Sequence, residues 1–413
     1  MVRLFIGILK CILNCPTPLK VSKRVAGVRY AIRDVLAEAR RVRQQGTEML
    51  YLNIGDPVQY GFHPPTNVTE AAIKAIRDGK NYYGDSEGLP DLREAIAKKE
   101  TSKGLHTSAE GILVSNGVSE ALDMVMSSII EEGDEVLLPG PYYPPCAAYI
   151  KIHGGVPVEF AVNGSEPDID DIRSKITPKT VAISIASPGN PTGWVFDKRS
   201  LQQLADVAGE HDLYIISDEI YDRIVFDGEF AGVGSISPDI PAVILNGFSK
   251  GHLMTGWRIG YVAFSDSTLL DNLRDNVRRL ATMRIAANLP VQYAALESLR
   301  GPQDYVTDFV SEVKRRRDIV MRRLDSIPGL SCSVPRGTFY AFPKIEENPY
   351  SSDWEFVMKL IRRGVLTVPG SGFGSRYGSG HFRLVFLPQP DILESALDKI
   401  EDFLRSSSTS STA

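Results

Sequence analysis

Cysteine and basic runs are scarce in this sequence, and each absence excludes a class of protein. Four cysteines occur, at positions 11, 15, 146 and 332, too few and too scattered for a disulfide scaffold. No second cysteine pair or histidine cluster completes the pair at 11 and 15, so no metal site is expected. The net charge is −5 and no long basic run appears, so nucleic acid is not an implied partner. A reducing cytoplasmic compartment fits best.

Long hydrophobic runs are missing too. The apolar opening, residues 1–15, contains Arg3 and Lys10 and is too short to span a bilayer. Lys10 interrupts the apolar core that a signal peptide requires, and no small-residue cleavage site follows. We therefore expect no membrane partner. Residues 1–23 are expected to be an N-terminal extension, either an amphipathic segment or one upstream of the true start. The Ser- and Thr-rich residues 406–413 are expected to form a disordered tail.

What remains is an ordinary globular composition with a strand–helix alternation. Of the 413 residues, 43% are hydrophobic and 23% are charged, and the length allows two or three domains. Repeated strand-then-helix patterns from residue 111 to 264 predict an α/β fold with a mostly parallel sheet. The predicted strands are 49–54, 111–114, 135–138, 180–186, 213–216, 242–245, 334–342 and 381–386. The predicted helices are 29–43, 91–103, 115–132, 290–326 with a break at Gly301-Pro302, 353–363 and 390–404.

Polar side chains follow the predicted buried strands. Asp218 comes just after strand 213–216 and Lys250 follows strand 242–245, at the edge where open α/β sheets bind ligands. A buried carboxylate is costly unless it meets a cation. A desolvated lysine has a lowered pKa and becomes a nucleophile toward carbonyls. Arg258, eight residues later, offers a fork suited to phosphate. A carbonyl and a phosphate together describe pyridoxal phosphate (PLP).

Two further segments favour anions. Strand 111–114 leads through small residues into a helix beginning near Ser115–Glu120, and free N–H groups at a helix N-terminus bind anions. An ordinary N-cap at Ser115 or Ser119 is the alternative. Arg383 stands among apolar neighbours in strand 381–386, and a buried arginine demands an anion. That anion is either a substrate carboxylate or an internal acidic residue.

The lysine segment carries the pattern S-K-x5-G-W-R-x-G-Y from Ser249 to Tyr261, and residues 187–193 read S-P-G-N-P-T-G. With these motifs, residues 24–405 resemble the class I and II aminotransferases of PLP fold type I. The segments N-I-G-D-P-V, Y-Y-G-D-S-E-G-L-P and N-G-F-S-K look most like the alanine aminotransferase branch. The resemblance implies a large PLP domain (65–300) with a mostly parallel sheet between helices. It also implies a smaller α+β domain assembled from residues 24–64 and 301–405.

The resemblance also implies a role for each matching residue. Lys250 would hold PLP as a Schiff base and move the substrate proton, while Asp218 keeps the ring nitrogen protonated. Substrate binding would fall to Gly55, Asn190 and Arg383. Cofactor binding would fall to Gly117, Val118, Ser119, Tyr143, Asn190, Asp218, Tyr221, Ser249 and Arg258, with Tyr83 reaching across a homodimer with shared sites. The implied reaction is ping-pong transfer of an amino group between an L-amino acid, alanine or glutamate, and a 2-oxo acid.

Several alternatives stay open from the sequence. An aspartate or aromatic aminotransferase, or a PLP-dependent lyase, would share these motifs. Gly247 stands where the family often has a phosphate-binding serine, and Ser249 either compensates for it or does not. Arg284 either binds a second substrate carboxylate or is structural. The glycines of 370–375 resemble a dinucleotide-binding loop, but their spacing is wrong and a strand follows instead of a helix.

Overall fold

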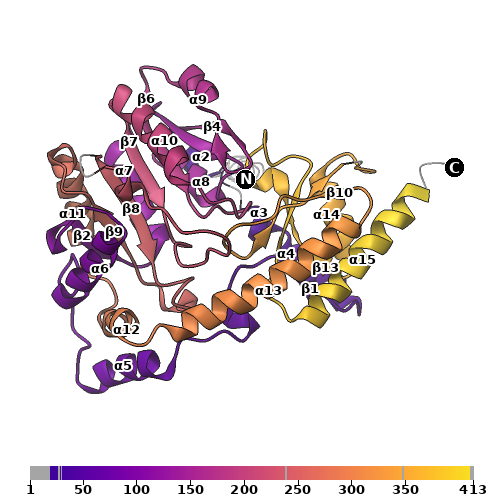
Figure 1. Cartoon of the computed structure of the whole chain (residues 1–413), viewed down its shortest axis with the longest axis horizontal. Coiled ribbons are helices and arrows are strands. Elements are labelled where there is room, and N and C mark those ends of the chain that lie inside the picture. The colour runs from indigo at the N-terminus through magenta and orange to yellow at the C-terminus, as the bar shows by residue number, and fades with distance from the viewer. Residues whose placement is uncertain (1–18, 27, 29, 238–239, 347, 410–413) are drawn as a thin grey trace, which may run out of the picture.

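A computed structural model describes residues 19–26, 28, 30–237, 240–346 and 348–409. An eight-stranded sheet forms the centre of its larger part, with strand order β2-β9-β8-β7-β6-β3-β4-β5 (Figure 1). Strands β8, β7, β6, β3 and β4 are parallel neighbours, whereas β9 and β5 are antiparallel to theirs. The strands are β2 (Ile112–Ser115), β3 (Glu135–Gly140), β4 (Val156–Asn163), β5 (Glu166–Pro167), β6 (Thr180–Ala186), β7 (Tyr214–Asp218), β8 (Ala242–Gly247) and β9 (Gly260–Phe264).

Both faces of this sheet are buried, because successive side chains of a strand point to opposite faces. In β8, Ala242 and Ile244 belong to one core, whereas Val243 and Leu245 belong to the other. The first core is completed by α6 (Pro90–Ser102), α10 (Lys198–Glu210) and α12 (Leu289–Arg300), and the second by α7 (Val118–Ile129), α8 (Pro144–Ile152) and α11 (Asp271–Arg284). Helix α5 (Thr66–Arg77) packs on α12, and α9 (Ile169–Lys175) on β4. The result is a three-layer α/β architecture.

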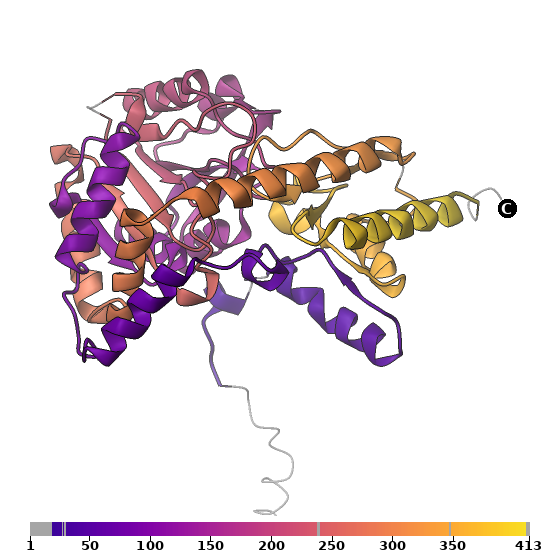
Figure 2. The same cartoon turned by 60° about the horizontal axis from the view of Figure 1, so that its bottom comes forward.

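The smaller part gathers both ends of the chain around one core. Val35 and Ala39 near the N-terminus share this core with Phe356 and Leu397 near the C-terminus. Its helices are α3 (Ala31–Asp34), α4 (Leu36–Gln44), α14 (Asp353–Arg362) and α15 (Pro390–Thr409). Its strands are β1 (Leu50–Tyr51), β10 (Leu330–Ser331), β11 (Tyr340–Ala341), β12 (Lys344–Ile345), β13 (Val365–Leu366), β14 (Val368–Pro369) and β15 (Phe382–Val385). The long helix α13 (Asp304–Ser326) runs from the larger part into this one (Figures 1 and 2), and the short α2 (Lys23–Ala26) lies by α8.

Most predicted elements are confirmed, with changes at their ends. Strand β6 has the predicted bounds, and the predicted break at Gly301-Pro302 separates α12 from α13. The helix predicted over 29–43 is interrupted at Val35, and strands 49–54 and 334–342 shrink to two residues each. Helix α15 continues past its predicted end at Leu404 and includes residues 406–409 of the predicted tail. The predicted extension at 1–23 lies mostly outside the described residues.

No helix in the described ranges is long and apolar enough to cross a membrane.

Candidate functional site

A cavity of about 380 Å³ opens at the carboxyl edge of the central sheet. Nearly all residues predicted from the sequence to bind cofactor or substrate line it: Gly55, Val118, Ser119, Tyr143, Asn190, Asp218, Tyr221, Ser249, Lys250, Arg258 and Arg383. The smaller part of the molecule contributes Tyr340 and Arg383, and the segment before α4 contributes Tyr30 and Arg33. The site therefore lies between the sheet and the smaller part.

Sheet topology brings these residues together. Strand β7 ends at Asp218, and Asn190 and Lys250 follow β6 and β8 within four residues. Because β6, β7 and β8 are parallel, their carboxyl ends meet at one edge. Arg258 precedes β9 rather than following it. Since β9 runs antiparallel to β8, its beginning lies at that same edge.

Lys250 is a half-buried residue that lines the cavity. Its Nζ donates a hydrogen bond of 2.6 Å to the carbonyl oxygen of Gly55. Burial lowers the pKa of Lys250 to about 8, although the carboxylate of Asp56 opposes the shift. A Cβ atom at Gly55 would lie 2.1 Å from the Tyr340 hydroxyl, so only glycine lets the chain pass between Tyr340 and the lysine. A large fraction of Lys250 is thus neutral near pH 8 and able to attack a carbonyl.

Asp218 is a half-buried residue whose carboxyl group has no cationic partner among the described residues. Burial raises the pKa of Asp218 to about 7, against the hydrogen bond that its Oδ1 accepts from the Ile220 N–H at 3.1 Å. No lysine or arginine in the described ranges lies within ion-pair distance of it. A carboxylate in such surroundings gains most from a cation brought by a ligand.

An anion cradle lies where α7 begins. Gly117 has a left-handed φ of 87°, and a Cβ atom there would lie 2.5 Å from Nη2 of Arg258. The guanidinium therefore lies directly against the backbone that precedes the helix. Arg258 itself has a φ of 55°, which is a strained conformation for a non-glycine residue. Free N–H groups at Val118 and Ser119, the helix dipole and Arg258 all favour a phosphate.

Ser249 is the residue that could supply a hydroxyl group to this cradle in place of the glycine at position 247. Ser249 lines the cavity, one residue before Lys250. A Cβ atom at Gly247 would lie 2.9 Å from the Gly260 Cα and from the Ile259 carbonyl oxygen. The close approach of β8 and β9 thus leaves no room for a serine at Gly247.

Arg383 is buried, with 1% exposure, yet no carboxylate in the described ranges pairs with it. Its Nη1 donates to Oδ1 of Asn190 at 2.8 Å and its Nη2 donates to the carbonyl oxygen of Asn53 at 2.5 Å. The buried Nε has no partner, and the guanidinium lies 4.3 Å from the centroid of the Tyr340 ring. The alternative of an internal salt bridge is therefore not what the structure shows. A ligand carboxylate would satisfy this charge.

Of the two tyrosines predicted to contact the ring of PLP, Tyr221 is buried and Tyr143 is half-buried. The hydroxyls of Tyr221 and Tyr340 lie 2.9 Å apart. Burial, reinforced by Tyr340, raises the pKa of Tyr221 well above its ordinary value. Burial also raises the pKa of Tyr143, with Tyr30 as a hydrogen-bond partner. Both phenols therefore stay protonated and able to donate.

Two other residues named from the sequence lie elsewhere. Arg284 forms an ion pair of 2.8 Å with Glu120 and donates to the carbonyl oxygen of Ser86 at 2.7 Å. These contacts favour the structural alternative for Arg284. Tyr83 is 80% exposed and lies outside the cavity lining, so its role across a dimer stays a prediction.

The sequence did not single out Asp56, Thr255, Tyr340 or Tyr30 as site residues. Oδ1 of Asp56 accepts a hydrogen bond of 2.6 Å from the Thr255 hydroxyl, which joins the turn after β1 to the lysine segment. Asp56 directly follows Gly55, so its place in the same turn could have marked it as a site residue. No local signal marks Tyr340, because its role depends on contacts with distant residues.

Comparison with known proteins agrees with this geometry. Residues 47–400 match the family model "Aminotransferase class I and II". The chain is 35% identical to glutamate-pyruvate aminotransferase AlaA of Escherichia coli, covering 94% of this chain and 98% of that protein. It is also 35% identical to aspartate aminotransferase of Geobacillus stearothermophilus, covering 94% and 99%. The structure of an alanine aminotransferase from Pyrococcus furiosus superposes with a TM-score of 0.92 at 46% identity, covering 94% and 100%. The chain therefore belongs to the class I and II aminotransferase family.

Proposed function

We propose that this chain is a PLP-dependent alanine aminotransferase, which exchanges the amino group between L-alanine and 2-oxoglutarate by a ping-pong mechanism. The observation that carries the proposal is that one cavity is lined by both the neutralisable amine of half-buried Lys250 and the unpaired carboxyl group of half-buried Asp218. The names of the relatives support the alanine assignment. The compartment we infer is the cytoplasm.

The residues present fit PLP. Gly117, Val118, Ser119, Ser249 and Arg258 form the cradle for its phosphate. Tyr143, Asn190, Asp218 and Tyr221 would surround its ring, with Asp218 facing the ring nitrogen. When bound, PLP supplies an electron sink that stabilises a carbanion at the substrate Cα.

The chain's own residues then hold and move protons. Lys250 is the amine that holds the cofactor, and its Nζ then takes the proton from the substrate Cα as a general base. Asp218 keeps a proton at the ring nitrogen. The hydroxyl of Tyr221 would donate a hydrogen bond to the ring oxygen, and the amide nitrogen of Asn190 would donate a second one.

Substrate orientation falls to Arg383. Its unpartnered Nε and neighbouring Nη groups offer the bidentate geometry that a carboxylate prefers. Gly55 gives the backbone room to approach that carboxylate. Arg383→Lys should raise KM for every amino acid at least about tenfold, since hydrogen bonds to charged groups contribute about 1.5–3 kcal/mol. PLP affinity should stay unchanged, and a parallel loss of PLP would argue against this assignment.

A second carboxylate of glutamate needs a cation, and Arg33 is the available one. Arg33 lines the cavity and forms no ion pair with another described residue, whereas Arg284 is already paired with Glu120. Arg33→Gln should therefore lower kcat/KM for L-glutamate and spare L-alanine. Arg284→Gln serves as the matched control, and it should lower the melting temperature without changing the preference.

A homodimer with shared sites is the proposed assembly. Four large apolar or aromatic side chains are exposed in two adjoining segments: Tyr82 (60%), Tyr83 (80%), Met283 (82%) and Ile285 (46%). The Ser86 hydroxyl donates to the Ile285 carbonyl oxygen at 2.6 Å, which joins the segments. A second copy of the chain would cover this surface and bring Tyr83 to the partner's phosphate.

The test is a half-reaction measured without acceptor. PLP-loaded protein mixed with L-alanine alone should release one equivalent of pyruvate per site, and later 2-oxoglutarate should yield one equivalent of L-glutamate. Aspartate aminotransferase activity is the second candidate, favoured by the similarity to the Geobacillus enzyme. Faster release of oxaloacetate from L-aspartate would move the specificity to that candidate. Continuous release of product without an acceptor would indicate a lyase.

A further inference from the structure

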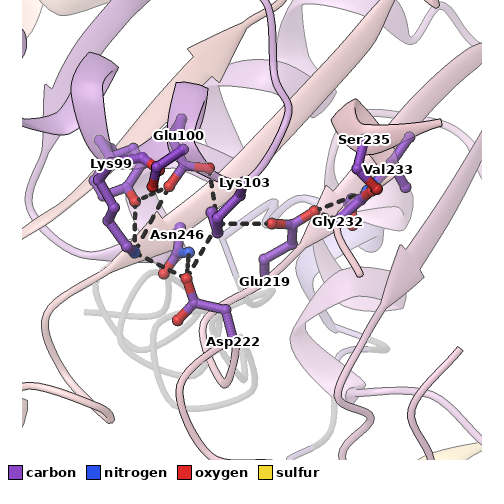
Figure 3. Close-up of polar contacts among 12 residues, drawn as sticks. Lys99, Glu100, Lys103, Glu219, Asp222, Gly232, Val233, Ser235 and Asn246 are labelled. Carbon is purple, nitrogen blue, oxygen red and sulfur yellow. Dashed lines mark hydrogen bonds and ion pairs between the residues drawn. The ribbon is translucent and has the colours of Figure 1, made fainter. Parts of the chain in front are cut away.

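A group of buried and half-buried polar side chains lies between the end of α6 and the ends of β7 and β8 (Figure 3). Its members are joined by ion pairs and hydrogen bonds, and we call it the α6 network: Lys99, Glu100, Lys103, Glu219, Asp222, Asn246 and Tyr261. It holds three carboxyl groups against two ammonium groups. Helix α6 carries Lys99 and Glu100, Lys103 directly follows its last residue, and the strand ends carry most of the rest.

Lys103 is the centre of this network. Its Nζ lies 2.7 Å from Oε2 of Glu100, 2.9 Å from Oε2 of Glu219 and 3.0 Å from Oδ2 of Asp222. Burial alone would lower the pKa of Lys103, but the three carboxylates raise it well above its ordinary value. The ammonium group therefore stays charged and holds three segments of the chain at one point.

The other members attach the network to the sheet. The Asn246 amide, at the end of β8, donates to Oδ2 of Asp222 at 2.9 Å, and Lys99 lies 2.9 Å from the same oxygen. Glu219 accepts on both oxygens, because Oε1 also takes hydrogen bonds from the Val233 N–H at 3.2 Å and the Ser217 hydroxyl at 3.3 Å. The network thus fixes the backbone on both sides of the turn that follows β7.

Members of the network are next to cavity residues in the chain. Glu219 follows Asp218, and Asp222 follows Tyr221. Asp218 and Tyr221 line the cavity, whereas the Glu219 carboxylate points toward α6 (Figure 3). Asn246 lies four residues before Lys250. Moving the network would therefore displace the groups that face the ring.

Stability alone does not account for such a cluster. Burying several charges costs desolvation that their attraction barely offsets, so replacing them with apolar side chains is often neutral or stabilising. What a fully bonded polar cluster does provide is one defined geometry. Reacting groups need such a fixed geometry, because a displacement of about 1 Å can lower the reaction rate roughly 100-fold.

We propose that the α6 network sets the positions of Asp218, Tyr221 and Lys250 around the cofactor, with Lys103 and Glu219 as positioning residues. The inference rests on the proposed PLP-dependent function. It assigns a role to Lys103 and Glu219, which contact neither cofactor nor substrate but fix the positions of the residues that do.

Glu219→Gln is the most direct variant. It keeps the shape of the side chain, but its amide nitrogen cannot accept, so either Lys103 or the Val233 and Ser217 donors lose a partner. We expect PLP to bind about tenfold more weakly, as when outer-shell partners of other bound groups are removed. The absorption maximum of bound PLP should shift. The value of kcat should fall while KM for L-alanine stays close to wild type, because Arg383 and Asn190 are untouched.

A matched control is Glu312→Gln in α13. Glu312 also pairs with buried Arg316, at 2.8 Å, but it lies in the smaller part of the molecule, outside the cavity lining. Both variants should lower the melting temperature of the PLP-free protein. Only Glu219→Gln should change PLP affinity and absorption. If Glu219→Gln folds poorly, Asp222→Asn carries the same test, since Oδ2 of Asp222 accepts from Lys99, Lys103 and Asn246.

The double variant Lys103→Met/Glu219→Gln separates position from charge. It removes one ammonium and one carboxyl group, so the charge balance equals that of the wild type while the contact is lost. We expect PLP binding as weak as in Glu219→Gln. Recovery to the wild-type affinity would overturn the positioning role, and so would a Glu219→Gln protein whose PLP affinity, absorption and kcat all match the wild type. Wild-type protein that binds no PLP would instead refute the proposed function itself.

Discussion

Burial shifts the pKa values of Asp218 and Lys250 in opposite directions. Loss of water disfavours the charged form of each group, so it raises the pKa of the acid and lowers that of the amine. Perturbed groups of this kind concentrate at functional sites. Each shift disappears when a ligand supplies what is missing, a cation for Asp218 and a carbonyl for Lys250.

The raised pKa of Asp218 predicts a pH-dependent cost in the PLP-free protein. The pKa rises from its ordinary 3.8 to about 7 on folding. Between these values the folded state binds a proton that the unfolded state lacks, so stability falls as pH rises from about 4 to 7 and levels off above that. Asp218→Asn removes this cost. At pH 8 the variant should be more stable than wild type, by roughly 4 kcal/mol at most, and at pH 4 the two should be equal.

Urea unfolding of the two PLP-free proteins at pH 4, 6 and 8 checks this expectation. A variant that is less stable than wild type at pH 8 would contradict it. The same variant should bind PLP more weakly and lose about 10²–10³-fold in kcat, the usual cost of removing one electrostatic partner of a reacting system.

The lowered pKa of Lys250 predicts the pH dependence of PLP capture. The rate at which PLP-free protein gains the absorption of bound PLP should be half-maximal near pH 8. The charged groups facing the amine are Asp56, Asp218, Arg258 and Arg383. Since the Asp56 carboxylate raises this pKa, Asp56→Asn should move the midpoint to lower pH. Stopped-flow absorbance gives both midpoints, and an unchanged or higher midpoint in the variant would exclude this role for Asp56.

The sequence was enough to name the cavity-lining residues that follow buried strands. Asp218 and Lys250 were predictable because polar groups at such strand ends need a partner. Tyr340 was not, since its importance comes from its contact with Tyr221, 119 residues away in the chain. The sequence also left open whether Arg284 binds a substrate carboxylate or is structural, because only the folded structure places Glu120 beside it.

At the scale of elements, the start of α7 shows how a helix and a neighbouring strand combine. The helix supplies free N–H groups, and the antiparallel β9 delivers Arg258 to the same place. Sequence reasoning predicted a mostly parallel sheet and recovered β6 to the residue. The antiparallel β9 was not predicted, because its sequence is as apolar as the parallel strands of the same sheet. Only the absence of a helix between β8 and β9 indicates the reversal.

Gly117→Ala tests this combination. The new Cβ would lie 2.5 Å from the Arg258 guanidinium at a φ of 87°. We expect a stability cost of about 1 kcal/mol from the left-handed backbone. PLP affinity should fall at least about tenfold as Arg258 is displaced, the size expected for a lost charged hydrogen bond.

The matched control is Gly133→Ala, with a φ of 92° and no atom within 4 Å of the added Cβ. It should cost similar stability and leave PLP affinity at the wild-type value. PLP affinity would be measured by fluorescence titration. Equal affinities for the two variants would contradict phosphate binding by the start of α7 and Arg258.

At the scale of the whole molecule, the chain ends join in one core, as the resemblance implied. The domain boundaries at residues 64 and 300 stay predictions, since long α13 links the two parts without an evident border (Figure 2). The exposed surface formed by Tyr82, Tyr83, Met283 and Ile285 is the one that a second copy of the chain would cover. That surface is therefore the place to test the assembly.

Ile285→Asp should convert the proposed dimer to a monomer. A charge placed in an apolar interface is left without a partner when the second copy docks. Ile285 has an unusual φ of 79° for a β-branched residue, and it is 46% exposed. Ile392→Asp, at an exposed site on α15, is the control and should leave the assembly unchanged. Sedimentation velocity distinguishes the two. A wild-type protein that is monomeric at micromolar concentration would refute the shared site.

The central claim is that Lys250 holds PLP, and chemical trapping tests it most directly. Purified protein would be incubated with PLP, reduced with borohydride, digested and analysed by peptide mass spectrometry. The account predicts a phosphopyridoxyl group on the peptide that contains Lys250, at close to one per chain, and its loss when L-alanine is added before reduction. A label on another lysine, or no label at all, would contradict it.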